Sequence, residues 1–338
     1  MRVDAARGHR AGRGRPRVWG LVVASALSVL TAGAVGASAS SAGAASAPTG
    51  TVVATAPGPA GPVLVVGSGP KQNFALYFLT SDTPSKPACT TTVVTLAPGA
   101  QFPCTGPLTS QDADWPALTT VGRPVAGPGV RQALLGRVHR ADLGADQVTY
   151  AGHLLYVFDA QPLQFTGDSY NEGTLPPDHG VWYLVAPKRG LAAPSVATAT
   201  TVTLSGGRSV LGAVMSSGAL TGGTPSPVSF PVYVYSVDRV GQSKCQAACA
   251  VAFPPLLTSA APTVAPNHGL SVGAFGVVVR ADGTHQVTYR GRPLYVDANE
   301  QIDAANPAAP FAGTGDGAKP PGRAAGTFSV VAAPAGSS

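Results

Sequence analysis

Two short strands and a tight turn are encoded in Gln147-Val-Thr-Tyr-Ala-Gly-His-Leu-Leu-Tyr-Val157. Apolar and polar residues alternate on both sides of Ala151-Gly152, which is typical of a β-hairpin whose turn needs glycine at positive φ. The same pattern recurs at 286–296 as Gln-Val-Thr-Tyr-Arg-Gly-Arg-Pro-Leu-Tyr-Val. The chain is therefore expected to form equivalent antiparallel hairpins at two places along its length.

The similarity between the two parts of the chain extends upstream of these hairpins. Arg140-Ala-Asp142 corresponds to Arg280-Ala-Asp282, and the segment Phe74–Asp82 corresponds to Phe230–Asp238. Such self-similarity at a fixed distance predicts a leader followed by two homologous halves. The expected segments are a signal peptide over 1–39, a Pro/Gly/Ala-rich lead-in over 40–62, half one over 63–187, a linker over 188–202 and half two over 203–334.

The fold class follows from composition and local pattern. The 338 residues include 42 Gly and 32 Pro, and hydrophobic residues make up 44% against 11% charged residues, which argues against disorder and against a long charged coiled coil. Helical periodicity is hardly visible after the leader. We expect an all-β fold, a tandem repeat of antiparallel β units with disulfide-closed loops, arranged as a sandwich, a barrel or a propeller-like array.

The N-terminal region has the pattern of a secretory signal. Basic residues extend to Arg17, an apolar stretch covers 18–35, and Ala37-Ser-Ala39 offers a cleavage site. An uncleaved membrane anchor is the alternative, and it is the only way in which we expect a membrane to be a partner. The sequence predicts export to the cell envelope or the extracellular space, without a lipobox cysteine because the first cysteine is Cys89.

The positive charge of the chain is concentrated in this leader. Six of the 22 Lys and Arg residues, but only one of the 16 Asp and Glu residues, precede residue 18. The remaining chain is nearly neutral and has no basic stripe that could follow phosphates. Nucleic acid is therefore not expected as a partner.

Four cysteines in an oxidising compartment are most often two disulfides. Three pairings are possible, and proximity in the sequence favours Cys89 with Cys104 and Cys245 with Cys249. The alternative interpretation of Cys245-Gln-Ala-Ala-Cys249 is a metal or redox site. No His pair stands at ligand spacing beside it, so neither a metal site nor a cofactor is expected.

The segment Tyr233-Val-Tyr-Ser-Val-Asp238 is followed by Cys245-x-x-x-Cys249 and Phe253-Pro-Pro-Leu256. This order resembles the secreted-repeat family of predicted bacterial lipoproteins with a Tyr-x-(Phe/Trp/Tyr)-x-x-Asp motif, although Phe253 stands where that family has Trp. The resemblance covers most of 63–334. It implies a compartment and an architecture rather than a chemistry, because the family has no settled activity.

The motif positions are the candidate structural or binding residues. Only one of four copies matches the motif fully; Tyr77, for example, is followed by Leu79 where an aromatic residue is expected. This decay favours a structural role: tyrosines packed in the core rather than in a stacking platform, and aspartates in Asx-turns rather than on Ca²⁺ or sugar. The candidates are Tyr77, Asp82, Tyr156, Tyr233, Tyr235, Asp238 and Tyr295.

No catalytic residue is assigned, since nucleophile, Walker and dinucleotide motifs are missing from the sequence. Asp112-Ala-Asp114-Trp115 has the composition of a sugar cleft, but it lies in a Pro/Thr-rich segment. We expect an exported, non-enzymatic β-repeat protein with an unknown envelope or extracellular ligand. The alternatives are an extracytoplasmic metal- or haem-binding or redox accessory protein, which requires reduced cysteines or a His, Tyr and Cys cluster, and a hydrolase of envelope glycans, which requires paired carboxylates in a cleft.

Overall fold

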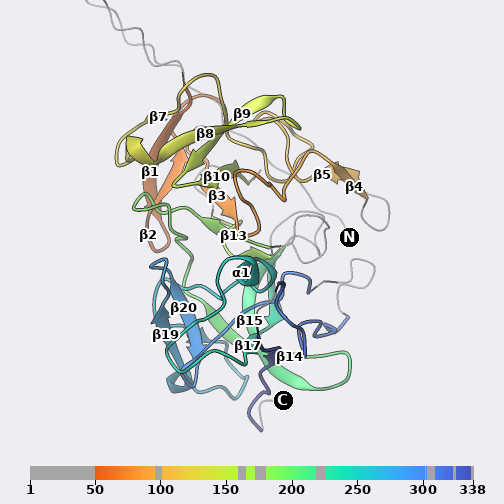
Figure 1. The fold of residues 1–338 in the computed structure, drawn as a ribbon. Coiled ribbons are helices and arrows are strands. Elements are labelled where there is room, and N and C mark those ends of the chain that lie inside the picture. Colours follow the sequence, from red (N-terminus) through yellow and green to blue (C-terminus); the bar gives the residue numbers. More distant parts are fainter. Residues whose placement is uncertain are drawn as a thin grey trace, which may run out of the picture. The chain divides into compact units, whose positions relative to one another are not determined.

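A computed structural model describes residues 50–95, 101–158, 165–171, 180–217, 226–300, 302, 309–322 and 325–335. The predicted signal peptide and the beginning of the lead-in lie outside these residues. The regular structure that is described consists almost entirely of β-strands, which confirms the all-β prediction (Figure 1). Among the described residues, no helix is long and apolar enough to cross a membrane.

Both predicted hairpins are present. Strand β9 (Ala145–Tyr150) pairs with β10 (His153–Leu154), and β20 (His285–Tyr289) pairs with β21 (Arg292–Pro293), each through a two-residue turn. Positive φ at both central positions is the geometry of a type I′ turn, which matches the twist of the strands. The φ values are 49° for Ala151, 87° for Gly152, 49° for Arg290 and 77° for Gly291.

Gly291→Val is expected to destabilise the second hairpin. A β-branched residue is strained at positive φ by about 1–2 kcal/mol, and a Cβ at this position would lie 2.7 Å from Val240 Cγ1. Gly152→Val carries the same backbone strain, but a Cβ there meets no atom within 4 Å. In urea unfolding we expect Gly291→Val to be the more destabilised variant, with Gly206→Val as the unstrained control. Equal stability of all three variants would contradict the turn assignment.

Six sheets contain the described strands. In the first, β1 (Val52–Gly58) pairs antiparallel with β2 (Gly61–Val66) and parallel with β7 (Val125–Ala126). In the second, β9 lies between β8 (Leu135–Arg140) and both β10 and β6 (Thr119–Thr120). Three small sheets comprise β19 (Phe275–Val279) with β20 and β21, β17 (Tyr233–Tyr235) with β22 (Phe328–Val330), and β4 (Val93–Thr95) with β5 (Gln101–Pro103).

The largest sheet takes strands from both predicted halves. Its link is a parallel pairing between β12 and β15, at Tyr170 and Ser216. The described strands therefore form an open sheet here, and they do not close into a barrel. The order is β11 (Tyr156–Val157), β3 (Leu76–Leu79), β13 (Val181–Leu184), β12 (Tyr170–Asn171), β15 (Ser209–Ser217), β14 (Thr198–Thr203) and β18 (Thr263–Val264), with β16 (Ser226–Pro231) also on β15.

Two predicted connecting segments differ from the structure. Residues 52–58 belong to β1 rather than to an extended lead-in, and 198–202 belong to β14 rather than to a linker. Both segments are rich in Val and Thr, whose β-branched side chains favour strands. Their Ala, Pro and Ser content hid this preference. The only described α-helix is α1 (Ala248–Ala252), and two 3₁₀ turns cover Gln132–Leu134 and Val272–Ala274.

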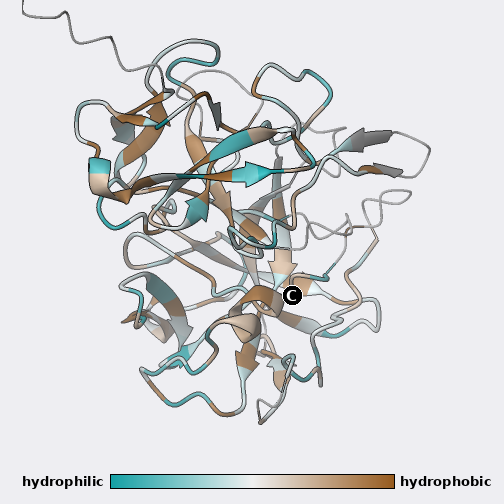
Figure 2. Ribbon diagram, turned by 45° about the horizontal axis from the view of Figure 1, so that its top comes forward, coloured by the Kyte–Doolittle hydropathy of each residue, from teal (hydrophilic) through white to brown (hydrophobic). Residues whose placement is uncertain are grey.

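One hydrophobic cluster joins the two predicted halves. Leu76 and Tyr183 from half one belong to the same buried cluster as Leu256 and Val287 from half two. The Tyr183 hydroxyl also donates a hydrogen bond of 3.2 Å to the carbonyl of Pro255. Figure 2 shows hydrophobic residues gathered on many strands and on α1, with hydrophilic residues frequent in the loops. The described core is therefore shared between the halves.

Each half also has an aromatic stack of its own. In half one, Trp115 lies flat on Trp182, with ring centroids 3.9 Å apart, and Tyr156 meets Trp182 edge-on at 5.0 Å. Stacked and edge-to-face pairs stabilise a core beyond their buried area. Half two repeats the arrangement, with Phe253 flat on Phe328 at 3.7 Å and Tyr295 edge-on to Phe328 at 5.4 Å.

Candidate ligand-binding cleft

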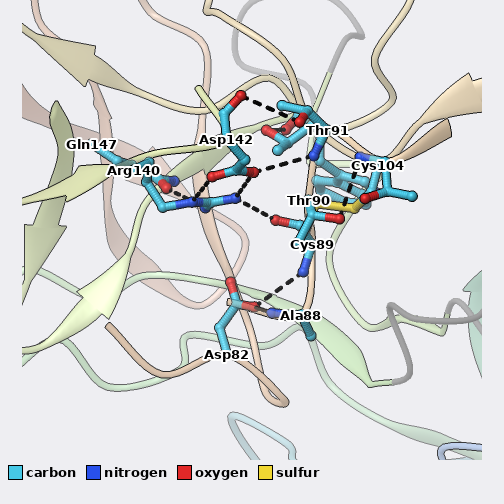
Figure 3. A network of polar contacts seen from close by, with 12 residues as sticks. Asp82, Ala88, Cys89, Thr90, Thr91, Cys104, Arg140, Asp142 and Gln147 are labelled. Atoms are coloured by element: carbon cyan, nitrogen blue, oxygen red, sulfur yellow. Dashed lines mark hydrogen bonds and ion pairs between the residues drawn. A yellow bond between two sulfur atoms is a disulfide. The ribbon is translucent and has the colours of Figure 1, made fainter. Parts of the chain in front are cut away.

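Arg140 organises a buried polar network in half one (Figure 3). This residue ends β8 and is 3% exposed. Its Nε and Nη2 donate to the Asp142 carboxylate at 2.8 and 2.7 Å, and Nη2 also donates to the Cys89 carbonyl at 2.8 Å. Nη1 donates to Gln147 Oε1 at 2.7 Å and to the Tyr156 hydroxyl at 3.2 Å. The buried cation is thus paired and hydrogen-bonded, as burial of a charge requires.

Asp82 joins this network to the first disulfide loop. Its Oδ1 accepts hydrogen bonds from the backbone N–H groups of Ala88 and Cys89 at 2.6 and 3.3 Å, and its Oδ2 accepts from the Tyr156 hydroxyl at 2.6 Å. Burial raises the pKa of Asp82 to about 6. The predicted Asx-turn, in which the carboxylate accepts from the backbone two residues on, is not what forms at Asp82. Its Oδ1 accepts from backbone N–H groups six and seven residues further along the chain.

The same contacts recur around Asp238 and Arg280 in half two. Arg280 is 5% exposed, and Asp238 is 8% exposed. A second polar network therefore holds the second disulfide loop, and it again consists of an aspartate, a tyrosine, an arginine and a glutamine. Asp238 accepts from Lys244 N and from the Tyr295 hydroxyl, both at 2.7 Å; Arg280 donates from Nη1 to Gln286 Oε1 at 2.7 Å and from Nη2 to the Cys245 carbonyl at 2.9 Å.

Both predicted disulfides are present, Cys89–Cys104 and Cys245–Cys249. In each pair, the carbonyl of the first cysteine accepts a hydrogen bond from the buried arginine of its own network. Disulfides persist in oxidising environments, so the pairing indicates an extracytoplasmic location. It also leaves no reduced cysteine among the described residues for a thiolate metal or redox site.

The five motif tyrosines lie in the core. Each is at most 2% exposed, so none can present an open ring face to a ligand. Tyr77 meets Trp115 edge-on at 5.5 Å, and Tyr235 stacks on Phe328 at 4.5 Å. These buried tyrosines take part in the aromatic stacks and in the polar networks. They are Tyr77, Tyr156, Tyr233, Tyr235 and Tyr295.

Four network residues were not singled out from the sequence. Their buried guanidinium and amide groups connect each disulfide loop to its hairpin, yet charged and amide side chains are normally expected on the surface. The one feature of the sequence that points to them is that each arginine and each glutamine has a counterpart at the corresponding position of the other half. These residues are Arg140, Gln147, Arg280 and Gln286.

The two networks differ in how the arginine meets its neighbouring aspartate. Arg280 Nε lies 3.7 Å from Asp282 Oδ2, whereas Arg140 Nε donates to Asp142 at 2.8 Å. Asp282 Oδ1 instead accepts from the backbone N–H and hydroxyl of Thr284, at 2.8 and 2.6 Å. In the described part of the chain, Arg280 Nε is buried without a hydrogen-bond partner.

Arg280 is one of the residues that line a cleft of about 1080 Å³. The cleft is lined by the segment that follows β3, by His153 of β10, by α1, and by Arg280 with its neighbours. Its size is at the upper end of the range typical of small-molecule sites. The apolar wall includes Phe78, Leu191, Val251, Pro255 and Leu257, and the charged or titratable residues of the lining are Lys86, His153, Arg280 and Asp282.

His153 is held against the apolar wall. Its ring lies 4.4 Å from the Phe78 ring. Burial lowers the pKa of His153, and the charge of Asp282 opposes this effect. The imidazole is therefore neutral at neutral pH, and the lining carries two cations, Lys86 and Arg280, against the single carboxylate of Asp282.

The acidic segment singled out as a possible sugar cleft is not part of this site. Asp112 is exposed, and Trp115 is 1% exposed within the aromatic stack. Neither Asp112 nor Asp114 lines the cleft. Within the described ranges, no group of three or more His, Cys, Asp or Glu residues is arranged to hold a metal ion.

Comparisons of the chain with protein-family models, with curated proteins and with solved structures found no match. The resemblance to the secreted-repeat family therefore stays a prediction from the motif.

Two buried carboxylates predict that stability falls as the pH rises above 4. Burial raises the pKa of Asp168 to about 6, as it does for Asp82. An acid whose pKa is higher in the folded state binds its proton more tightly when folded, so stability is lost between the unfolded and folded pKa values. The hydrogen bond from Arg140 lowers the pKa of Asp142, and this opposite effect acts below that interval. Burial lowers the pKa of His153, and this opposite effect acts within the interval, so a variant of Asp168 is needed to isolate the carboxylate.

The free energy of unfolding is expected to be higher at pH 4.5 than at pH 7, by about 2 kcal/mol from Asp168 alone. Urea unfolding at a series of pH values measures this. Asp168→Asn should reduce the difference, whereas Asp112→Asn, at an exposed site, should leave it unchanged. The same difference between pH 4.5 and pH 7 in the parent protein and in Asp168→Asn would contradict the burial argument.

Proposed function

We propose that this chain is an exported, non-enzymatic β protein of the cell envelope or extracellular space that binds a ligand in the cleft. The observation that carries the proposal is that the motif residues form hydrogen bonds with one another and with the protein backbone inside the fold. Asp82 and Asp238 accept hydrogen bonds from Tyr156 and Tyr295, and each holds the loop of its disulfide. These residues build a scaffold, and the cleft provides the concave surface that a binding protein needs.

The repeat is the second part of the proposal. Two copies of one unit explain why the aromatic stack, the arginine network and the disulfide loop each occur twice with similar distances. Duplication also explains the difference at Arg280, because one copy can keep the complete ion pair while the other acquires a ligand site. A rigid scaffold closed by disulfides suits a protein exported by its N-terminal signal.

The test is the intact mass of the protein recovered from the medium or envelope of an expressing cell, with and without thiol alkylation under denaturing conditions. We expect a mass that begins near Ser40, no alkylation and no bound metal. A retained leader with alkylated cysteines would overturn the proposal in favour of an anchored redox protein. Stoichiometric metal in the same sample would favour a metal carrier.

A further inference from the structure

The cleft is lined by apolar residues and by a few charged ones. Phe78, Val251 and Leu257 contribute apolar surface from three separate segments, and several alanines of the α1 region widen the space. Apolar walls favour an apolar ligand body, because contact removes hydrophobic surface from water. Lys86, which is exposed, and Arg280, which is buried, give the lining an excess of positive charge over Asp282.

Two lining residues carry buried polar atoms that have no hydrogen-bond partner in the described part of the chain. These atoms are Ser81 Oγ and Arg280 Nε. Buried donors are normally satisfied, and a buried donor without an acceptor costs free energy. At the equivalent position in half one, Arg140 Nε has a carboxylate acceptor at 2.8 Å. Arg280 Nε meets the Asp282 carboxylate only in an ion pair of 3.7 Å, so a ligand oxyanion closer to this atom would supply the hydrogen bond that it lacks.

We propose that the cleft binds a single-chain anionic amphiphile, a molecule with an acyl-like apolar body and one carboxylate or phosphate head group. This inference rests on the proposed binding function. The apolar body contacts Phe78, Val251 and Leu257, and the head group accepts a hydrogen bond from Arg280, while the Lys86 ammonium adds a second positive charge to the lining. Oxyanions are the acceptors that a guanidinium pairs with most strongly.

Asp282 provides the movement that this binding needs. Arg280 Nε is enclosed in the structure, so a ligand oxygen reaches it only when a side chain of the wall moves. Asp282 is 50% exposed and is already turned toward Thr284 through two hydrogen bonds. Its exposed carboxylate can therefore turn further toward solvent and give up the 3.7 Å ion pair with Arg280 Nε.

The first experiment compares ligands of equal chain length by isothermal titration calorimetry below their critical micelle concentrations. Laurate and dodecyl phosphate test the two head groups, dodecyltrimethylammonium reverses the charge, and butyrate removes the apolar body. We expect saturable binding of laurate, of dodecyl phosphate or of both, at least tenfold weaker binding of the cation, and no measurable binding of butyrate. Equal binding of the cation and the anions, or no saturable binding of either anion, overturns the inference.

The second experiment locates the site with matched variants. Lys86→Glu reverses the charge at the cleft and should weaken anion binding about tenfold, whereas Lys188→Glu makes the same change at an exposed position outside it. Ala248→Trp fills the cleft from an exposed position and should abolish binding, with Ala60→Trp as its control. Equal effects in a variant and its control place binding elsewhere and overturn the inference.

The two proposals can fail separately. A protein that is exported and closed by disulfides, but binds no anionic amphiphile, leaves the proposed scaffold function intact and refutes the ligand class alone. A protein that retains its leader and has free thiols refutes the exported scaffold, whatever the result with laurate.

Discussion

Arg140→Met is expected to lower the free energy of unfolding by about 3–5 kcal/mol, the usual result of removing one partner from a buried ion network. The methionine fills part of the space but donates no hydrogen bond. The Cys89 carbonyl, the Gln147 amide oxygen and the Asp142 carboxylate then lose their donor. Urea unfolding with the disulfides intact measures the loss.

Two further variants make the Arg140 result specific. Arg137→Met removes a cation that is 45% exposed in its ion pair with Asp146, so we expect a loss below about 1 kcal/mol. Arg280→Met should be strongly destabilising but less so than Arg140→Met, because Arg280 Nε has no hydrogen bond to lose. If Arg140→Met and Arg137→Met unfold at the same urea concentration, Arg140 does not organise the fold.

Glu300→Ala is expected to lower the free energy of unfolding by a similar amount, about 3–5 kcal/mol, because several buried donors lose their acceptor. Glu300 is 1% exposed and accepts hydrogen bonds from the backbone N–H groups of Gly313 and Thr314, at 2.9 and 3.0 Å, and from the Tyr233 hydroxyl. Its removal leaves these donors buried without an acceptor. The loss of stability is measured by thermal and urea unfolding.

The conservative variant Glu300→Gln keeps one carbonyl oxygen and should recover part of the lost stability. Asp112→Ala serves as the control for removal of an exposed carboxylate, with an expected change within about 0.5 kcal/mol. A Glu300→Ala protein as stable as the Asp112→Ala protein would show that the donors of Gly313 and Thr314 find other partners.

The sequence predicted the local features that depend on neighbouring residues. The hairpin at Arg290-Gly291 needs positive φ, and polar and apolar residues alternate over 286–289 before it, so the sequence was enough to predict the turn and its strands. The pairing of Cys245 with Cys249 followed from their proximity. In contrast, the prediction of a lead-in over β1 is wrong. Pro57 and Gly58 are typical of irregular segments, and they outweighed the strand preference of the valines and the threonine before them.

The candidate site could not be read from the sequence, because it depends on residues far apart in the chain. Phe78, His153 and Asp282 line one cleft although about 200 residues separate the first from the last. Only the fold shows that Trp115 is buried, which removes the aromatic residue from the supposed sugar cleft. Only the structure shows that Arg280 Nε lacks the hydrogen bond that Arg140 Nε makes.

The central claim is that the motif aspartates and tyrosines build two equivalent scaffolds. It is tested most directly by parallel double-mutant cycles in urea unfolding, with Asp82→Ala and Tyr156→Phe in one cycle and Asp238→Ala and Tyr295→Phe in the other. The hydrogen bonds of 2.6 and 2.7 Å predict a favourable coupling of about 1–3 kcal/mol in both cycles. Coupling near zero in both cycles, or in one cycle only, would contradict the claim.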